Sequence, residues 1–360
     1  MSSFFKHLGM VAFALLPILS SAALQTGKVQ VGKTSGAVTI IDANSQRKPL
    51  ETGAVFQEGS LVETGINSTA ELVFSNGASL VLTPNTLIQL RTFRQVPSAA
   101  IIDPYRQIEK DPSPSVTELE VPRGKIIGEV RKLNALSTFT VKTPAGLVRI
   151  RGTVFSIEYR VSPSGMGQIT VDCVRGSVET TVYSSNTGPV SVDPGMQMSS
   201  SVPSAALVNS LAQSANAEPG APRPEVPSPA VLTALSKPVK VVAYPIPAES
   251  LQSLSNILAA NSTLPAEVSA TIGAMAATAP SRDQIFAGGS DEPAKGFGTV
   301  ISDRQPSDDV AKVGKTNSPN GPATTSNGGS SSLDDTLKKL GENVDRSVEK
   351  QQVFSTNPGG

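Results

Sequence analysis

Short apolar runs that alternate with polar residues and stop at glycines fill residues 29–197, and this pattern constrains the fold most strongly. Alternation with a period of two is typical of strands that bury one face, and no segment in this stretch has the 3.6-residue period of a helix. Many short strands at regular spacing predict an all-β fold, as a sandwich, barrel or solenoid. The chain has one cysteine, Cys173, which excludes an internal disulfide, so apolar burial must hold this part together.

Residues 71–82 predict a hairpin whose loop length follows from its apolar residues. The Asn-Gly pair suggests a two-residue turn, but that register divides the large apolar side chains between two faces. A three-residue loop with a left-handed Gly77 gathers five apolar residues on one face: Leu72, Phe74, Ala78, Leu80 and Leu82. Val73 and Val81 then point to the other face, which we expect to be partly covered.

Residues 139–159 predict two strands in which the apolar phase changes once. Val148 and Ile150 alternate in one phase, whereas Phe155 and Ile157 follow the other. The change occurs at Gly152, which indicates a bulge or a corner of the sheet.

Composition divides the chain into two parts. Residues 24–200 contain eight aromatic residues, whereas residues 201–360 contain four. A segment so poor in large apolar side chains cannot easily offset its chain entropy by burial. We therefore expect a β domain over residues 24–200, followed by a largely disordered tail rich in Ala, Ser, Pro and Gly. Leucines at helical spacing and local composition predict short helices in that tail, over residues 248–260, 264–278 and 333–350.

The first residues have the features of an export signal. Lys6 and His7 precede an apolar run over residues 8–19, and Ser21 and Ala23 stand where a signal peptidase reads small side chains. The run is shorter than the ~20 residues of a membrane-spanning helix. We expect residues 1–23 to be a cleaved signal peptide and the mature chain to be periplasmic or secreted, without a transmembrane helix.

The residue inventory excludes most familiar catalysis. His7 is the one histidine and lies in the expected signal peptide, so histidine triads and histidine metal sites are excluded from the mature chain. One cysteine excludes iron–sulfur clusters, and Cys173 falls in phase with Ile169 and Val171, as a buried packing residue would. We expect no enzyme, no metal and no cofactor, although a carboxylate pair for acid–base chemistry stays open. The 30 basic and 30 acidic residues balance, so no nucleic-acid partner is implied.

Residues 27–34 satisfy the phosphate-loop pattern letter for letter. That loop binds phosphate only between a buried strand and the N-terminus of a helix. Residues 35–41 read as a strand, so nucleotide binding is not expected.

Two arginines are the first candidate for an interaction surface. Arg149 and Arg151 are two residues apart, which places them on one face of a strand. Arg123 and Arg175 stand in similar Arg-Gly contexts, and together the four residues suggest an anion-binding stripe. Solvated arginines on a sheet face are the alternative.

The proline-rich segment 96–118 is the second candidate, because a loop of this length in a small domain is often functional. Tyr105 and Arg106 are its candidate contact residues. The alternative is an insertion without a partner.

Residues 55–197 resemble the FecR family, named for a periplasmic regulator of iron-dicitrate uptake. The fairly specific part is Thr143-Pro144, Gly146 and Arg151-Gly152-Thr153 followed by Phe155. The first half matches at Gly59, Thr64-Gly65, Ser68, Ala70, Leu72, Asn76-Gly77 and the run from Leu82 to Thr86, and the second half closes with residues 171–178 around Gly176 and with Gly195.

The resemblance implies a β-rich, solenoid-like periplasmic domain of a regulator that senses an outer-membrane transporter and controls a sigma factor. This sequence departs from that pattern, because no cytoplasmic helical domain precedes the apolar segment and a long tail follows the domain. The sequence therefore predicts a non-enzymatic binding module that engages another protein of the cell envelope, with a role in signal sensing. The alternative is a structural protein that rests on cell-wall glycan.

Overall fold

The computed structural model describes residues 23–183, 185, 187–204, 207, 239–262, 266–290 and 292–302. Residues 1–22 of the expected signal peptide and the helix expected over 333–350 lie outside this part. The strands are β1 (Gln25–Thr26), β2 (Val29–Ser35), β3 (Val38–Ile41), β4 (Arg47–Pro49), β5 (Val55–Phe56), β6 (Leu61–Thr64), β7 (Thr69–Phe74), β8 (Ser79–Leu82), β9 (Leu87–Gln95), β10 (Ser115–Glu129), β11 (Thr138–Thr143), β12 (Gly146–Val161), β13 (Met166–Val182), β14 (Val190–Val192), β15 (Met196–Pro203), β16 (Val241–Pro245) and β17 (Thr299–Ser302). The helices are α3 (Ala248–Asn261), α4 (Ala266–Ala276) and α5 (Arg282–Ile285), with short 3-10 turns η1 (Tyr105–Gln107) and η2 (Ala287–Gly289).

The strands form one hydrogen-bonded sheet that folds over on itself into two layers. Layer 1 has the order β4-β3-β6-β9-β10-β11-β12-β13-β14. Layer 2 has the order β5-β2-β7-β8-β10-β12-β13-β15-β16-β17. Strands β10, β12 and β13 belong to both layers, because each is 15 to 17 residues long. The predicted all-β class with a sandwich-like form is confirmed.

One apolar core lies between the two layers. Phe74 in layer 2 meets Phe93 and Phe139 in layer 1 edge to face, with ring centroids 5.2 and 6.1 Å apart. All three rings are fully buried. Aromatic rings in this arrangement contribute beyond their buried area, so they join the layers at the centre of the fold.

The long strands pass between the layers at glycine bulges. Gly152 in β12 and Gly176 in β13 both have positive φ, 64° and 90°. The register between the two strands slips at this point, between Arg151 and Val154. Ile150 before the bulge and Phe155 after it both point into the core. The phase change predicted at Gly152 is therefore confirmed, and it keeps one side of the strand buried through the bend.

The hairpin between β7 and β8 has the predicted three-residue loop. Leu72 pairs with Leu80, the Phe74 amide donates to the Ala78 carbonyl at 2.8 Å, and Gly77 has a φ of 86°. The five apolar residues expected on one face all lie in the core.

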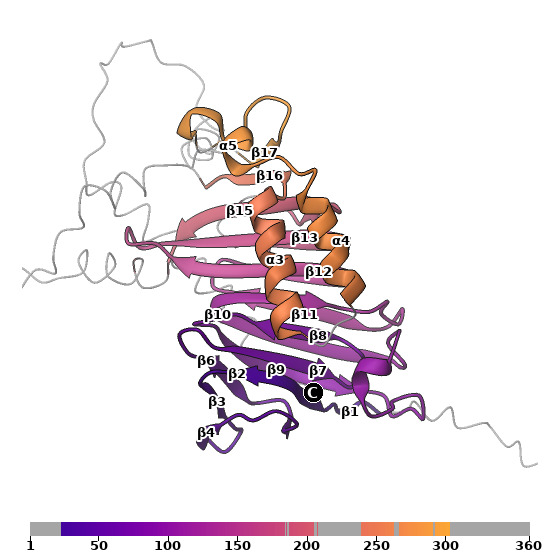
Figure 1. Ribbon diagram of the computed structural model, residues 1–360. Helices are drawn as coiled ribbons and strands as arrows, with labels where there is room; N and C mark the ends of the chain where they lie inside the picture. The colour runs from indigo at the N-terminus through magenta and orange to yellow at the C-terminus, as the bar shows by residue number, and fades with distance from the viewer. Residues whose placement is uncertain are drawn as a thin grey trace, which may run out of the picture.

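The outer face of layer 2 is covered by helices, which lie across its strands in Figure 1. Apolar residues of α3 and α4 pack there against Val81, Ile127, Val154 and Val174. At the C-terminal end of α3, the Lys33 ammonium donates to the Ala260 carbonyl at 2.6 Å and the Thr69 hydroxyl to Asn261 at 2.9 Å. A cation at a helix C-terminus complements the helix dipole, so these contacts hold the helix end on the sheet.

The sheet continues beyond residue 200, where the sequence analysis placed the end of the β domain. Strand β15 runs to Pro203, and β16 pairs with it in antiparallel fashion although 37 residues separate them. The tail assignment for residues 241–302 is therefore corrected. Composition averaged over the second half of the chain hid a dense apolar stretch: Val241, Tyr244, Ile246, Leu251, Leu254 and Leu258. The helices expected over 248–260 and 264–278 correspond to α3 and α4.

We expect Gly176→Ala to destabilise the fold by roughly 2–4 kcal/mol, because alanine disfavours positive φ and its Cβ would collide with the Gly152 carbonyl and Thr153. Urea denaturation of the variant measures this change. Gly188→Ala is the matched control, since a Cβ there meets nothing within 4 Å, and it should change stability by less than about 0.5 kcal/mol. Equal midpoints for the two variants would contradict the role of the bulge.

Candidate interaction surface

Most residues of the FecR-like motifs have structural roles. The Thr64 hydroxyl donates to the Thr83 carbonyl at 2.6 Å and accepts from the Thr86 amide at 2.9 Å. The Thr86 hydroxyl in turn donates to the Lys125 carbonyl and accepts from its amide. The hydroxyl of Thr143 accepts from two amides of the turn between β11 and β12, and Phe155 lies in the core. These residues fix turns and corners, so they are not free to act as a binding site.

No helix among the described residues covers the outer face of layer 1, which we call the open face, in contrast to the covered face of layer 2. Its outward side chains form cross-strand ion pairs: Arg91 with Glu120 at 2.8 Å, Lys142 with Glu118 at 3.6 Å, and Arg149 with Glu179 at 2.7 Å. Each of these side chains stays at least 30% exposed. Pairs this exposed contribute little to stability and can exchange for contacts with another molecule.

Arg149 and Arg151 both lie on this open face, as the alternation predicts. Their surroundings differ, because Arg149 pairs with Glu179 whereas Arg151 stands opposite Ser177. Among the described residues, none forms an ion pair with Arg151. Arg151 is also the member of the Arg-Gly-Thr string that is exposed, while Gly152 makes the bulge and Thr153 is buried. Packing therefore explains its neighbours but not Arg151.

Four cationic residues have their backbone at the bend around Gly152, and we name them the basic corner: Arg131, Lys132, Arg151 and Arg175. Arg131 and Lys132 follow β10, Arg151 belongs to β12 and Arg175 to β13. The backbone of Lys132 lies close to Gly152, and Arg175 directly precedes the second bulge at Gly176. Glu129 lies among them with a 4% exposed side chain and pairs with Arg175 at 3.0 Å and with Arg131 at 3.5 Å. Asp111 also lies next to Lys132, since its amide donates to the Lys132 carbonyl at 3.1 Å, so two carboxylates stand near four cations and leave an excess of positive charge at the edge of the open face.

Tyr105 and Arg106 lie elsewhere, in η1 on the outer side of layer 2. Tyr105 is buried and packs against Val73 together with Ile108, so the outer face at Val73 is covered, as the apolar pattern of the hairpin predicts. Burial, with a smaller effect of Asp103, raises the pKa of the Tyr105 hydroxyl. Packing on Val73 leaves the Tyr105 ring little exposed surface, and its role as a contact residue stays a prediction. Arg106 is exposed and lies beside Gly32.

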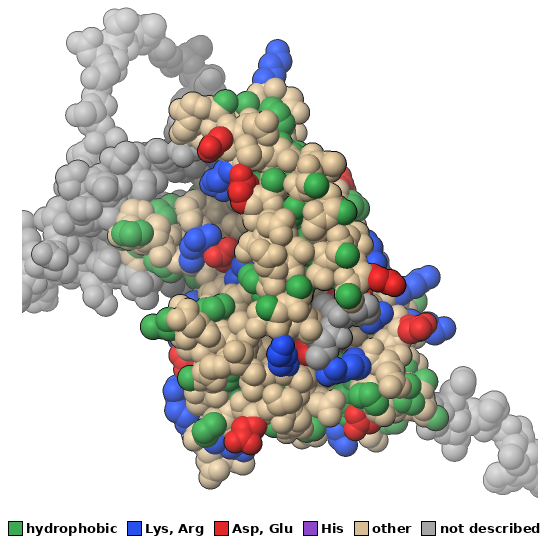
Figure 2. All heavy atoms as spheres, viewed as in Figure 1, with side chains coloured by type: hydrophobic (Ala, Val, Ile, Leu, Met, Phe, Trp, Pro, Cys, Tyr) green, Lys and Arg blue, Asp and Glu red, His purple; other side chains and the backbone are tan. Residues whose placement is uncertain are grey.

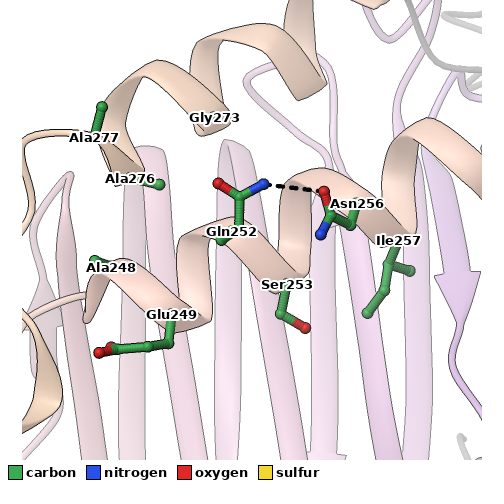
Figure 3. A pocket seen from close by; sticks show the side chains of 9 residues that line it. All are labelled: Ala248, Glu249, Gln252, Ser253, Asn256, Ile257, Gly273, Ala276 and Ala277. Atoms are coloured by element: carbon green, nitrogen blue, oxygen red, sulfur yellow. Dashed lines mark hydrogen bonds between the residues drawn. The ribbon is translucent and has the colours of Figure 1, made fainter.

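A groove of about 660 Å³ runs between α3 and α4 on the covered side. The surface over these helices is largely uncharged, with charged side chains towards its margins (Figure 2). Small and uncharged side chains line most of the groove, and the Gln252 amide donates to Asn256 at 3.0 Å within it (Figure 3). The lining residues are Ala248, Glu249, Gln252, Ser253, Asn256, Ile257, Gly273, Ala276 and Ala277.

The described residues offer no metal centre and no membrane-spanning helix. No three of their His, Cys, Asp or Glu side chains come together in a way that could hold a metal ion. Within the same ranges, no helix combines the length and the apolar content that crossing a bilayer requires. The phosphate-loop pattern falls on β2, an extended strand, which lacks the helix N-terminus that phosphate binding needs.

Residues 60–179 match the family model described as FecR protein. A search of curated proteins returned no match. Two crystal structures of a "putative anti-sigma factor" from Parabacteroides distasonis ATCC 8503, at 2.50 and 1.65 Å resolution, share 15% and 14% identity with this chain. The match to each structure covers 39% of this chain and 53% of the chain in that structure, and the TM-scores are 0.27 and 0.28. The chain thus spans about half the length of those proteins.

Cys173 is buried inside the core, as its phase in β13 predicts. Burial raises the pKa of its thiol to about 11, and the Asp193 and Asp172 carboxylates add to the rise. A nucleophilic cysteine needs the opposite shift, so this thiol is a packing group.

We expect a thiol reagent at pH 8 to modify the native protein at least about a hundredfold more slowly than the urea-unfolded chain, because a buried thiol reacts only after opening. The unfolded thiol titrates near ~8.5 and the folded one at about 11, so the native state holds its proton more tightly. The contribution of the Cys173 thiol to the free energy of unfolding is fully present below pH ~8.5, and it falls as the pH rises towards 11. Urea midpoints of wild type and Cys173→Ala should therefore converge or cross over this window, whereas a constant difference would contradict the assignment.

Proposed function

This chain carries a FecR domain over residues 60–179, and from this premise we propose that it is an exported, non-enzymatic interaction module of the cell envelope. In this proposal the basic corner and the adjoining open face bind an acidic surface of a partner protein. A role in sensing a signal through that partner follows from the family.

Arg151 is the observation that carries the proposal. It is an exposed cation on a rigid strand, it lacks an ion-pair partner among the described residues, and it stands opposite Ser177 on β13, two residues after Arg175, whose side chain is 67% exposed. Because Arg151 has no ion pair to break among the described residues, a carboxylate partner can bind it without displacing a carboxylate of this chain. Complementary charges of this kind raise the association rate and select the partner.

Several observations support binding over catalysis. The one histidine of the sequence is His7, and the one cysteine is the buried Cys173. The described carboxylates at the basic corner and open face are engaged with arginines and lysine. A surface built from such pairs suits recognition of another charged surface.

The glycan alternative receives less support from the open face. Sugar-binding sheet faces commonly offer several aromatic rings for stacking, whereas the outward residues along β10, β11 and β12 of layer 1 are Thr, Glu, Lys, Arg, Val, Leu and Pro, and Tyr183 near Glu120 is the aromatic residue described at this face. A protein partner with acidic side chains fits these residues better.

We expect Arg151→Glu to weaken binding of the envelope partner about tenfold or more, mainly through a slower association rate. The mature chain is used to isolate a partner from envelope extract, and surface plasmon resonance then compares variants at several salt concentrations. Wild-type affinity should fall with added salt, because exposed charges are screened. Arg175 is left in place, since its removal would strand the buried Glu129.

Arg160→Glu is the matched control for that experiment. Arg160 is also an exposed arginine of β12, with a 63% exposed side chain, but it lies at the far end of the strand. The control should bind as wild type does. Equal loss in both variants, or no loss in Arg151→Glu, would overturn the basic corner as the binding site.

The export part of the proposal has a separate test. The sequence places Ser21 and Ala23 at the recognition positions of a signal peptidase, so the exported protein should begin at Leu24. N-terminal sequencing of protein recovered from the envelope or medium measures this directly. An uncleaved Met1 in all fractions would contradict export by a cleaved signal.

A further inference from the structure

The groove between α3 and α4 has an occupant within the same chain: we propose that residues 333–344 dock in it as an amphipathic helix. This site is distinct from the basic corner, because it lies on the covered side of layer 2 whereas Arg151 lies on the open face of layer 1. The inference does not depend on the proposed function.

The groove forms because most of the large apolar side chains of the two helices point towards the sheet. Leu251, Leu254 and Leu258 of α3 and Ile272 of α4 are turned towards Val81 and Ile127. The groove between them is lined by three alanines, Ser253 and Gly273 together with the longer Glu249, Gln252, Asn256 and Ile257, and a Cβ on Gly273 would lie 3.2 Å from the Ser255 hydroxyl. Small residues at a close helix approach leave a depression that larger apolar side chains from another element can fill.

The segment 333–344 offers such side chains at the right spacing. Leu333, Leu337, Leu340 and Val344 follow one another at intervals of four, three and four residues. This is the pattern by which an amphipathic helix lays one face into a groove. A helix of this length is roughly 18 Å long, and the groove-lining part of α3, from Ala248 to Ile257, is roughly 15 Å.

The tether allows the segment to reach the groove. Strand β17 ends at Ser302 beside β16, and β16 leads into α3, so all three lie at the same end of the helix pair (Figure 1). Thirty residues separate Ser302 from Leu333. A chain of that length spans about 30 Å on average, which covers the distance along α3. Tethering of this kind gives effective concentrations near the millimolar range, which favours this occupant over a second copy at ordinary protein concentrations.

The segment 333–344 has three acidic residues, Asp334, Asp335 and Glu342, and two lysines, so its net charge does not favour this occupant, but its lysines offer one local pairing. Glu249, in the first turn of α3, is the charged residue among those that line the groove. Lys338 and Lys339 lie in the middle of the segment, next to Leu337. When Leu337 enters the groove, an adjacent lysine reaches a carboxylate at its rim.

Disulfide trapping in the full mature chain tests the proposal. Ser253→Cys lies in the groove, and Thr336→Cys flanks the apolar stripe without removing a leucine. Under mild oxidation this pair should form an intramolecular disulfide at least about tenfold faster than a control pair, Ser253→Cys with Ser326→Cys. The control cysteine sits on a shorter tether outside the segment, so random collision alone would make it react at least as fast. The buried Cys173 does not compete, because its thiol is shielded.

Adding Leu337→Asp and Leu340→Asp should remove the advantage of the first pair, which shows that apolar docking causes it. Equal rates for the two original pairs would overturn the proposal. Disulfide-linked dimers as the main product would also overturn it, since a second copy would then occupy the groove. Non-reducing electrophoresis with peptide mapping distinguishes these outcomes.

Discussion

Three strands serve both layers because the backbone changes direction at Gly152 and Gly176 without leaving the hydrogen-bonded ladder. The two glycines face each other across β12 and β13, and a Cβ on Gly176 would collide with the carbonyl of Gly152. The bend at this point lets Ile150 and Phe155 enter the same core from opposite sides of the bulge. The Phe74, Phe93 and Phe139 cluster then joins the layers that the bend has brought together. Arg151 and Arg175 each directly precede one of the two bulge glycines, so the fold and the basic corner have one geometric origin.

The two outer faces of the molecule have different chemistry because they meet different surroundings. The outer face of layer 2 carries Val81, Ile127 and Val154, and it is buried under α3 and α4. The outer face of layer 1 carries ion pairs such as Arg149 with Glu179, which suit contact with water. Burial of both faces makes layer 2 a rigid support, whereas layer 1 keeps one face available. A partner that binds the open face therefore meets a surface that does not need to rearrange.

Local patterns in the sequence predicted the features that depend on neighbouring residues. The loop at Gly77 and the bulge at Gly152 follow from the phase of nearby apolar side chains, and the open position of Arg149 and Arg151 follows from alternation in one strand. Features that depend on distant residues were missed. Tyr105 is buried by Val73, some thirty positions earlier, and β16 is held by β15 across an interval that has little regular pattern. The β-propensity of a segment does not predict such pairings, because each side chain is buried by a partner far away in the sequence.

The covering of layer 2 has a consequence for how this protein is made. Val81 and Ile127 belong to strands near the start of the chain, whereas the leucines that cover them, at positions 251, 254 and 258, come more than a hundred residues later. During synthesis the strands can pair before α3 exists, and their outer face then presents an apolar stripe to whatever is nearby. A nascent or truncated chain that ends before α3 therefore exposes an aggregation-prone apolar surface that is buried in the full-length protein. The yield of folded protein then depends on chaperones until the last third of the chain is synthesised.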